Sequence, residues 1–521
     1  MKVKSLNSLL RSAVLVTVFL CANAIHAATY REPFRPQFHF TPATNWMNDP
    51  NGMVFYDGEY HLFYQFNPFG DKWGHMSWGH AVSRDLVRWE HLPIALHEEN
   101  DVMIFSGSAV VDWKNTSGFG QDGKPPMVAI YTGHYTKKPL QNQHLAYSND
   151  KGRTWTKFAG NPVLDIGEKD FRDPKVFWHE PTRRWLMTVA WPIERKVRFY
   201  SSPNLKDWTH LSDFGPSGST TGIWECPDLF PLRIEGKRGA EKWALIVNVG
   251  SGAPAGGSGC QYFVGDFDGK QFTLDPSFPS GKDAALWADW GRDFYAAVSW
   301  SDIPKRDGRR LWLGWMSNWE YANDVPTSPW RSAMSIPREL SLRETSDGLR
   351  LVQQPVRELA RLRGKRHRIA KASLAEANAW LARFQPAGDL LEVVVEFESL
   401  PAAGELGLRI LTGTNESTVI RYQTSQGRLS LDRTQSGRVN FHPKFAGTHE
   451  APMRAKDGRL RLHLFFDTSS LEMFAADGES VLTDLILPTS SRRQLEVFAG
   501  RDADRLQVRS LEVWELSRAW R

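Results

Sequence analysis

Cysteine is almost absent from this chain, which has 3 cysteines in 521 residues. One of them, Cys21, lies in the N-terminal leader described below, which leaves Cys226 and Cys260. The sequence leaves open whether these two pair, but two cysteines cannot form the disulfide framework that holds small secreted domains together. The protein must therefore be stabilised by burial of a hydrophobic core.

An excess of charge of one sign is also absent. The formal net charge is +5, and removing the three positive charges of the leader, Lys2, Lys4 and Arg11, leaves only +2. A nearly balanced surface gives no reason to expect nucleic acid or an anionic membrane as a partner.

Sequence motifs for metals and nucleotides are missing as well. No pair of histidines lies on one helical face with a glutamate between them, and no glycine-rich loop precedes a helix. Residues 266–269 (DFDG) imitate the start of a calcium loop but lack the remaining ligands, so we expect a hairpin turn there. We therefore expect no metal and no cofactor.

Long hydrophobic runs are lacking too. The apolar stretch at residues 13–19 is well under the roughly 20 residues that span a bilayer. It follows basic residues and precedes small-residue cleavage sites after Ala24 and Ala27, which is the pattern of an export signal. We expect residues 1–27 to be a signal peptide and the protein to be secreted or periplasmic.

What the chain does contain is tryptophan, 22 residues of it, and strand-like sequence. Tryptophan commonly fills sheet cores or stacks on sugar rings, and composition alone does not choose between the two. Residues 53–66 form two β-rich runs around Asp57-Gly58, which indicates a hairpin. The same pattern recurs to about residue 340 without a long amphipathic helix.

A weak internal repeat divides this region into five units. Asp49, Asp173 and Glu225 each lie just before a proline that opens an aromatic strand, and Ser106 and Asp293 mark the corresponding points of two further units. Spacings of about 52 to 68 residues suit four-stranded blades with loops. The sequence thus predicts an all-β fold that begins with a five-bladed β-propeller, assigned to residues 28–340. Because innermost strands surround a propeller's axis, the three carboxylates would point into one central pocket.

The pattern changes from Pro337 onward. We assign residues 341–366 to a linker and 367–521 to a β-sandwich, since several short alternating strands with Gly- and Asp-rich turns follow. Ser373 and Glu376 form a capping-box pattern that predicts the start of a short helix. This part shows no cluster of carboxylates, so we expect a structural or dimer-forming role, with the protein a monomer or a homodimer.

Three motifs resemble those of glycoside hydrolase family 32, the β-fructofuranosidases. They are WMNDPNG at residues 46–52, FRDP at 171–174 and WECPD at 224–228, in the family's order. The resemblance implies a five-bladed propeller followed by a β-sandwich, in agreement with the repeat. It also implies hydrolysis of β-fructofuranosyl bonds with retention of configuration, through a covalent fructosyl-enzyme intermediate.

The resemblance assigns roles to individual residues. Asp49 would be the nucleophile, Glu225 the acid and then the base, and Asp173 a transition-state stabiliser. An oxocarbenium-like transition state needs negative charge near the anomeric carbon, and the departing oxygen needs a proton, so carboxyl groups suit the chemistry. The family pattern further implies a substrate-binding shell in which Asn48, Gln65, Ser106 and Arg172 bind hydroxyls, while Trp73 and Trp319 form apolar walls. For the two tryptophans, ordinary core packing is the alternative.

Residues 315–324 (WMSNWEYAND) resemble the exo-inulinase and levanase branch more than the intracellular sucrases. We therefore expect an exo-acting β-fructosidase that releases terminal fructose from levan or inulin, with sucrose as a secondary substrate. The alternatives are a fructosyltransferase that uses sucrose as donor and a non-catalytic sugar-binding propeller. An inverting arabinan- or xylan-cleaving hydrolase would share the fold, but the WMNDPNG signature argues against it. The sequence does not rank levan against inulin.

Overall fold

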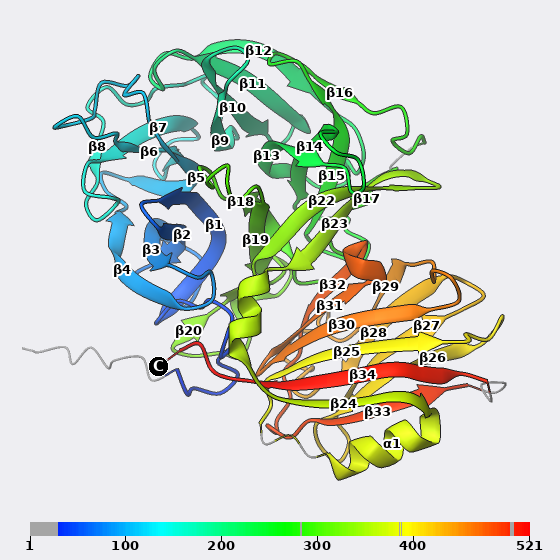
Figure 1. Ribbon diagram of the computed structural model, residues 1–521. Coiled ribbons are helices and arrows are strands. Elements are labelled where there is room, and N and C mark those ends of the chain that lie inside the picture. Colours follow the sequence, from blue (N-terminus) through cyan, green and yellow to red (C-terminus); the bar gives the residue numbers. More distant parts are fainter. Residues whose placement is uncertain (1–29, 282–283, 385, 387, 501–504, 521) are drawn as a thin grey trace, which may run out of the picture.

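The structure, a computed structural model, describes residues 30–281, 284–384, 386, 388–500 and 505–520 (Figure 1). The predicted signal peptide, residues 1–27, lies outside the described residues. Across the part of the chain that is described, no helix is long and apolar enough to cross a membrane.

Five antiparallel sheets surround a common axis and form the N-terminal part (Figure 1). The first contains β1 (Asn45–Tyr56), β2 (Glu59–Asn67), β3 (Ser77–Ser83) and β4 (Trp89–Leu96), with the short β20 (Trp330–Arg331) parallel to β1. The second contains β5 (Val102–Val111), β6 (Met127–Tyr135), β7 (Gln141–Ser148) and β8 (Thr156–Lys157). The third contains β9 (Arg172–His179), β10 (Arg184–Trp191), β11 (Lys196–Ser202) and β12 (Thr209–Phe214).

The last two sheets complete the ring. The fourth contains β13 (Trp224–Arg233), β14 (Glu241–Val249), β15 (Gly259–Phe267) and β16 (Phe272–Leu274), with β17 (Leu286–Trp287) beside β15. The fifth contains β18 (Tyr295–Ser299), β19 (Arg310–Met316), β22 (Arg338–Thr345) and β23 (Gly348–Pro355), with β21 (Ala333–Met334) beside β19. A 3₁₀ turn, η1 (Ala322–Asp324), precedes β20. The predicted five-bladed propeller is confirmed.

The fifth blade extends further along the chain than the sequence indicated. Strands β22 and β23 pair with each other and, through β22, with β19, and they carry the blade to Pro355. Much of the range 341–366 is therefore strand rather than linker. Only the 3₁₀ turn η2 (Arg357–Leu362) separates this blade from the first strand of the C-terminal part.

The C-terminal part is a two-sheet sandwich, as expected. One sheet orders β24 (Arg363–Ser373), β34 (Gln507–Leu516), β25 (Leu391–Glu398), β30 (Leu460–Asp467), β31 (Ser470–Ala475) and β32 (Ser480–Leu485). The other orders β29 (Thr448–Pro452), β28 (Arg428–Gln435), β27 (Ser417–Gln423), β26 (Glu405–Leu411) and β33 (Gln494–Ala499). Another 3₁₀ turn, η3 (Ala476–Gly478), joins β31 to β32. The helix α1 (Leu374–Arg383) begins with the predicted capping box of Ser373 and Glu376.

The hydrophobic core is divided among the blades. Each pair of neighbouring blades encloses its own cluster, such as Val54, Phe63 and Trp78 of the first blade against Ile104 and Tyr131 of the second. Strands that bury both faces in this way pack side by side around the axis. The apolar surface that they bury stabilises the ring by roughly 25 cal/mol for each Å² removed from water. The axis itself is left for polar side chains.

Candidate active site

All five innermost strands, β1, β5, β9, β13 and β18, carry a β-bulge at the same level of the propeller. In each, two residues oppose a single residue of the neighbouring strand. The bulged pairs are Asn48–Asp49, Phe105–Ser106, Asp173–Pro174, Cys226–Pro227 and Ala296–Ala297. A bulge interrupts the alternation of a strand and redirects its side chains, and here it turns polar groups toward the axis.

The three predicted acids lie at this level but not at one equivalent position. Asp49 is the second residue of its bulge, Asp173 is the first, and Glu225 comes just before Cys226. Asp173 and Cys226 have φ angles of 65° and 44°, in the left-handed region that side chains other than glycine rarely adopt. The expectation of identical blade positions was therefore too simple, because the local bulge decides which residue faces the axis.

Cys226 joins two of the acids. Its Sγ lies 3.6 Å from Asp49 Oδ2 and 3.6 Å from Asp173 Oδ2, and its backbone N–H donates to Asp173 Oδ2 at 2.9 Å. The charge of Glu225 acts on both Asp49 and Asp173, so the three carboxylates gather around one point although they are far apart in sequence. Cys226 is buried and free, as is Cys260, so the two do not form a disulfide.

Asp49 is held by hydrogen bonds to both of its oxygens. Asn48 Nδ2 donates to Oδ1 at 3.0 Å and Ser106 Oγ donates to Oδ2 at 2.7 Å. Asn48 is itself oriented by Trp46, whose Nε1 donates to Asn48 Oδ1 at 2.7 Å. Burial raises the pKa of Asp49, while the donors Asn48 and Ser106 oppose the shift and favour the ionised carboxylate.

Glu225 is held between a cation and a phenol. Arg172 places Nε and Nη2 each 3.0 Å from Glu225 Oε1, and Tyr295 Oη donates to Glu225 Oε2. Arg172 also donates through Nη1 to Gln141 Oε1 at 3.1 Å and to Asp170 Oδ1 at 3.0 Å. Burial works against the charged guanidinium, but the nearby carboxylates outweigh it and raise the pKa of Arg172, so this residue stays charged.

Asp173 has a strongly raised pKa. Burial first, and then the charges of Glu225 and Asp49, raise its pKa to about 7, while the guanidinium of Arg172 acts in the opposite direction. Like charges in one desolvated pocket cannot all ionise freely. The cluster is therefore a coupled set of acids of the kind that is common at functional sites.

The six residues expected around the carboxylates lie at different distances from them. Asn48, Ser106 and Arg172 contact the acids directly, as described above. Gln65 is buried opposite the bulge of β1 and donates to Ile104 O at 2.9 Å, so it links the first two blades. Trp319 stacks on Trp46, with ring centroids 6.1 Å apart, and thus backs the residue that orients Asn48.

Trp73 lies at the surface, with 42% of its side chain exposed. Its ring meets Phe105 edge-on, 6.1 Å between centroids, and Phe105 is the residue before Ser106. Through Phe105, Trp73 packs beside the strand segment that carries Ser106. Core packing, the alternative weighed for it, does not apply to a ring this exposed.

Asp293, expected to mark the fifth blade, does not face the carboxylates. Its Oδ1 accepts from Tyr321 Oη at 2.6 Å and its Oδ2 accepts from Arg433 Nη1 of the sandwich at 2.5 Å. The fifth blade contributes Tyr295 instead, at the pairing position that Arg172 and Glu225 occupy in their blades. Tyr295 was not predicted as a site residue, because a tyrosine within a strand-like run is usually a residue of the hydrophobic core.

Comparison with known proteins adds an independent line of evidence. Residues 39–355 match the model of the glycosyl hydrolases family 32 N-terminal domain, and residues 358–515 match that of the glycosyl hydrolases family 32 C terminal. The chain is 51% identical over 524 residues to a levanase of Bacillus subtilis (strain 168), covering 100% of this chain and 76% of that protein. It is 41% identical over 506 residues to the extracellular exo-inulinase inuE of Aspergillus niger, covering 91% and 93% of the two. The solved structure of exo-inulinase from Aspergillus awamori superposes with a TM-score of 0.86 at 36% identity, over 94% of this chain and 100% of that one.

Proposed function

The chain belongs to glycosyl hydrolase family 32, and from that premise we propose that it is an exo-acting β-fructosidase that releases terminal fructose from levan or inulin and also cleaves sucrose. The observation that carries the proposal is the gathering of Asp49, Asp173 and Glu225 around Cys226. The levanase and exo-inulinase relatives support fructan as the substrate class. The extracellular exo-inulinases also support a location outside the cytoplasm.

Asp49 acts as the nucleophile. Its Oδ2 accepts hydrogen bonds from Ser106 and Cys226, whereas Oδ1 accepts only the amide of Asn48, so Oδ1 is the oxygen left freer to attack. Attack on the anomeric carbon forms a fructosyl ester, and the bond to the glycosidic oxygen breaks at the same time. These donors favour the ionised carboxylate and fix it in one orientation before substrate arrives.

Glu225 supplies and then takes back the proton. It protonates the departing glycosidic oxygen, and afterwards its carboxylate removes a proton from the water that hydrolyses the ester. Arg172 and Tyr295 fix its two oxygens, which limits the directions from which it can serve substrate and water. Asp173 binds hydroxyls of the fructosyl ring and stabilises the positive charge of the transition state. Because each of the two displacements inverts the anomeric carbon, the two steps together retain its configuration.

Chromatography of the products from levan, inulin and sucrose tests this function. We expect fructose alone from the polymers, and loss of all three activities in Asp49→Ala and Glu225→Ala. A ladder of oligosaccharides from levan would contradict exo-cleavage, and oligosaccharides formed from concentrated sucrose would indicate transfer. With methanol as acceptor, retention requires methyl β-fructofuranoside as the product, and the α anomer would contradict the covalent intermediate.

A further inference from the structure

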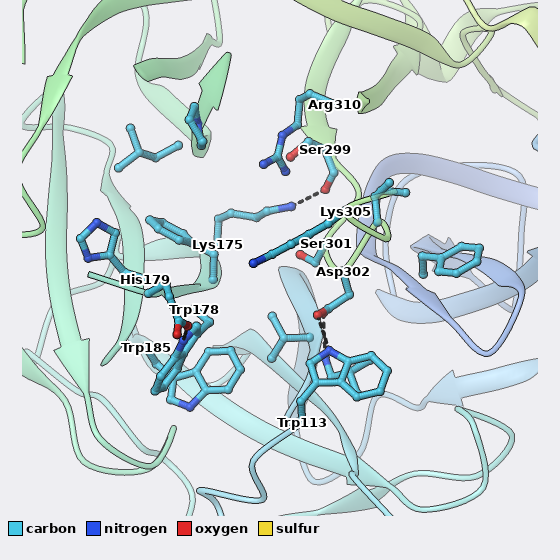
Figure 2. A pocket seen from close by; sticks show the side chains of 18 of the residues that line it. Trp113, Lys175, Trp178, His179, Trp185, Ser299, Ser301, Asp302, Lys305 and Arg310 are labelled. Carbon is cyan, nitrogen blue, oxygen red and sulfur yellow. Dashed lines mark hydrogen bonds between the residues drawn. The ribbon is translucent and has the colours of Figure 1, made fainter. Parts of the chain in front are cut away.

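A second cavity lies at the other end of the propeller axis from the three carboxylates. Figure 2 shows this cavity from close by. It has a volume of about 760 Å³, and its walls come from the far ends of the same innermost strands. Asp49 and Asp173 are near the starts of β1 and β9, whereas Phe55 and Phe177, near the ends of those strands, line the cavity. This size is within the range of pockets that bind small molecules or short segments of a chain.

A layer of buried polar residues separates the cavity from the carboxylates. Each innermost strand contributes one member, and together they are Asn51, Ser108, Lys175, Asp228 and Ser299, all at most 5% exposed. Their bonds run from blade to blade. Lys175 Nζ lies 3.5 Å from Asp228 Oδ2 and donates to Ser299 O, and Ser299 N–H donates to Asp228 Oδ2 at 2.7 Å. A molecule in the cavity therefore cannot touch the catalytic groups.

Trp113 forms a fixed aromatic surface at the rim of this cavity. Its side chain is 60% exposed, yet its Nε1 donates to Asp302 Oδ1 at 2.8 Å, and the other oxygen of Asp302 accepts from Val111 N–H at 2.9 Å. A large exposed ring normally has freedom to rotate, and this one is held in one orientation without being buried. Such preorganisation lowers the entropy cost of stacking a ligand on the ring.

Two further indoles line the cavity and lie opposite Trp113 in the view of Figure 2. Trp178 and Trp185 pack edge-on, 5.2 Å between centroids. Their N–H groups are already used, since Trp178 Nε1 donates to Glu180 and Trp185 Nε1 donates to Thr116 Oγ1 at 2.8 Å. Trp185 is only 4% exposed and backs Trp178, whose partly buried ring has only apolar surface left for a ligand.

The charges of the cavity wall balance one another. Lys175 is paired with Asp228, and Lys114 lies 3.7 Å from Glu180 and over the ring of Trp178. No excess of either sign calls for an ionic ligand. Fixed aromatic surfaces combined with Ser301, Lys305 and Arg310 as hydrogen-bonding groups suit a neutral molecule that has apolar C–H faces and many hydroxyls.

We propose that this cavity is a second carbohydrate site that holds a fructosyl segment of the polymeric substrate away from the point of hydrolysis. The proposal rests on the proposed function, which makes fructan the substrate. An exo-acting enzyme that dissociates from the polymer after a turnover must bind a chain end again. A second attachment keeps other chain ends nearby at a high effective concentration.

Affinity electrophoresis in gels that contain levan or inulin tests the proposal with the full chain. To keep the polymer intact, the variants are built in the Asp49→Ala background. We expect Trp113→Ala to weaken retardation by about tenfold in apparent affinity, equivalent to ~1.4 kcal/mol, and Trp113→Phe to recover part of it. Trp380→Ala, the same substitution on the sandwich helix α1, should leave retardation unchanged. With Asp49 restored, Trp113→Ala should hydrolyse sucrose at the parent rate.

The outcomes separate the second site from the catalytic function. Equal retardation of the parent and Trp113→Ala would overturn the second site, even if fructose is released normally. Retardation by dextran as strong as by levan would overturn the assignment to fructan. If the parent releases no fructose from any substrate but loses retardation on Trp113→Ala, the catalytic proposal fails and the polymer site stands. Should Trp113→Ala misfold, as judged by its thermal melt, Trp178→Ala is read in its place with the same outcomes.

Discussion

At the scale of single residues, the carboxylates differ chiefly in what holds them. Asp49 is fixed by neutral donors, Glu225 by a guanidinium and a phenol, and Asp173 by a backbone N–H. Neutral donors leave the negative charge of Asp49 without a fixed positive charge beside it. At Glu225, by contrast, the cation Arg172 fixes the position of the acid. The division of labour proposed for the three acids thus follows from their partners as well as from their identities.

Removing a single hydroxyl tests how Asp49 is held. Ser106→Ala deletes the donor 2.7 Å from Asp49 Oδ2, and a hydrogen bond to a charged group is worth about 1.5–3 kcal/mol. We expect kcat for sucrose to fall by roughly ten- to a hundredfold with little change in unfolding temperature. Steady-state kinetics and a thermal melt measure both, and an unchanged kcat would show that Ser106 does not act on the nucleophile.

Arg172 should also control the pH dependence. Its guanidinium opposes the rise in the pKa of Asp173 that burial and the charges of Glu225 and Asp49 produce. In Arg172→Gln the pKa of Asp173 rises further, so the ionised form is lost at higher pH. We expect the acid limb of the kcat/KM profile for sucrose to move to higher pH, while Arg172→Lys, which keeps the charge, moves it less. An acid limb that stays in place or moves to lower pH would contradict the coupling.

The site residues that lie within the three sequence motifs could be predicted from the sequence. The gathering of Asp49, Asp173 and Glu225 could be predicted because proline and aromatic neighbours mark where the innermost strands begin. Tyr295 could not be predicted, since its contact with Glu225 depends on how β18 pairs with β19. The position of Asp293 was predicted wrongly because it depends on another distant contact, the one with Arg433 of the sandwich.

At the scale of elements, the repeated bulge is the device that builds the site. A regular strand would turn alternate side chains to opposite faces, and one extra residue at the same level in each blade changes which residue meets the axis. Pattern and spacing predict that a strand exists but not its pairing register. This is why the number of blades could be predicted, whereas the offset between Asp49, Asp173 and Glu225 could not.

The hairpin of β1 and β2 offers a matched pair of glycines to test the packing behind Asp49. Both have positive φ, 53° at Gly52 and 85° at Gly58. A Cβ on Gly52 would lie 2.5 Å from Phe63 and 2.9 Å from Trp78, whereas one on Gly58 would meet nothing within 4 Å. We expect Gly58→Ala to cost about 1 kcal/mol of unfolding free energy from backbone strain alone.

Gly52→Ala adds a clash to the same strain. We expect it to cost about 2–4 kcal/mol of unfolding free energy and to lower kcat, because β1 must shift and it carries Asp49. Denaturant unfolding of the two variants measures the difference. Equal losses would show that the clash with Phe63 and Trp78 is relieved by local adjustment.

At the scale of the whole molecule, the sandwich supports the propeller through buried charges. Asp467 accepts the backbone N–H groups of Gln37, Phe38 and His39. Glu472 accepts from Arg338 of the fifth blade. The link was invisible in sequence because its members lie far apart in the chain, 134 residues for Arg338 and Glu472 and 428 to 430 for the contacts of Asp467, while the sandwich itself could be predicted from its strand pattern.

His39 makes this link sensitive to pH. Its Nδ1 lies 2.7 Å from Asp467 Oδ2 and its Nε2 lies 2.8 Å from Glu472 Oε1, and all three groups are buried. Burial alone would lower the pKa of His39, but the two carboxylates outweigh it and raise the pKa to about 9. A histidine whose pKa is higher in the folded state stabilises fully below its unfolded value of about 6.5 and loses that contribution as pH rises through the folded pKa.

We therefore expect the free energy of unfolding to fall by about 3 kcal/mol between pH 6.5 and pH 9 on account of this residue. Neutral His39→Gln should be less stable than the parent at pH 6 and should lose much less stability over the same interval. Denaturant titrations of both proteins at several pH values give the two curves. Parallel curves would show that His39 does not change its protonation on unfolding, and the carboxylates Asp467 and Glu472 would then be stabilised by Arg338 and backbone donors alone. A steeper loss in the parent would instead identify a histidine between two acids as the group that couples propeller and sandwich to pH.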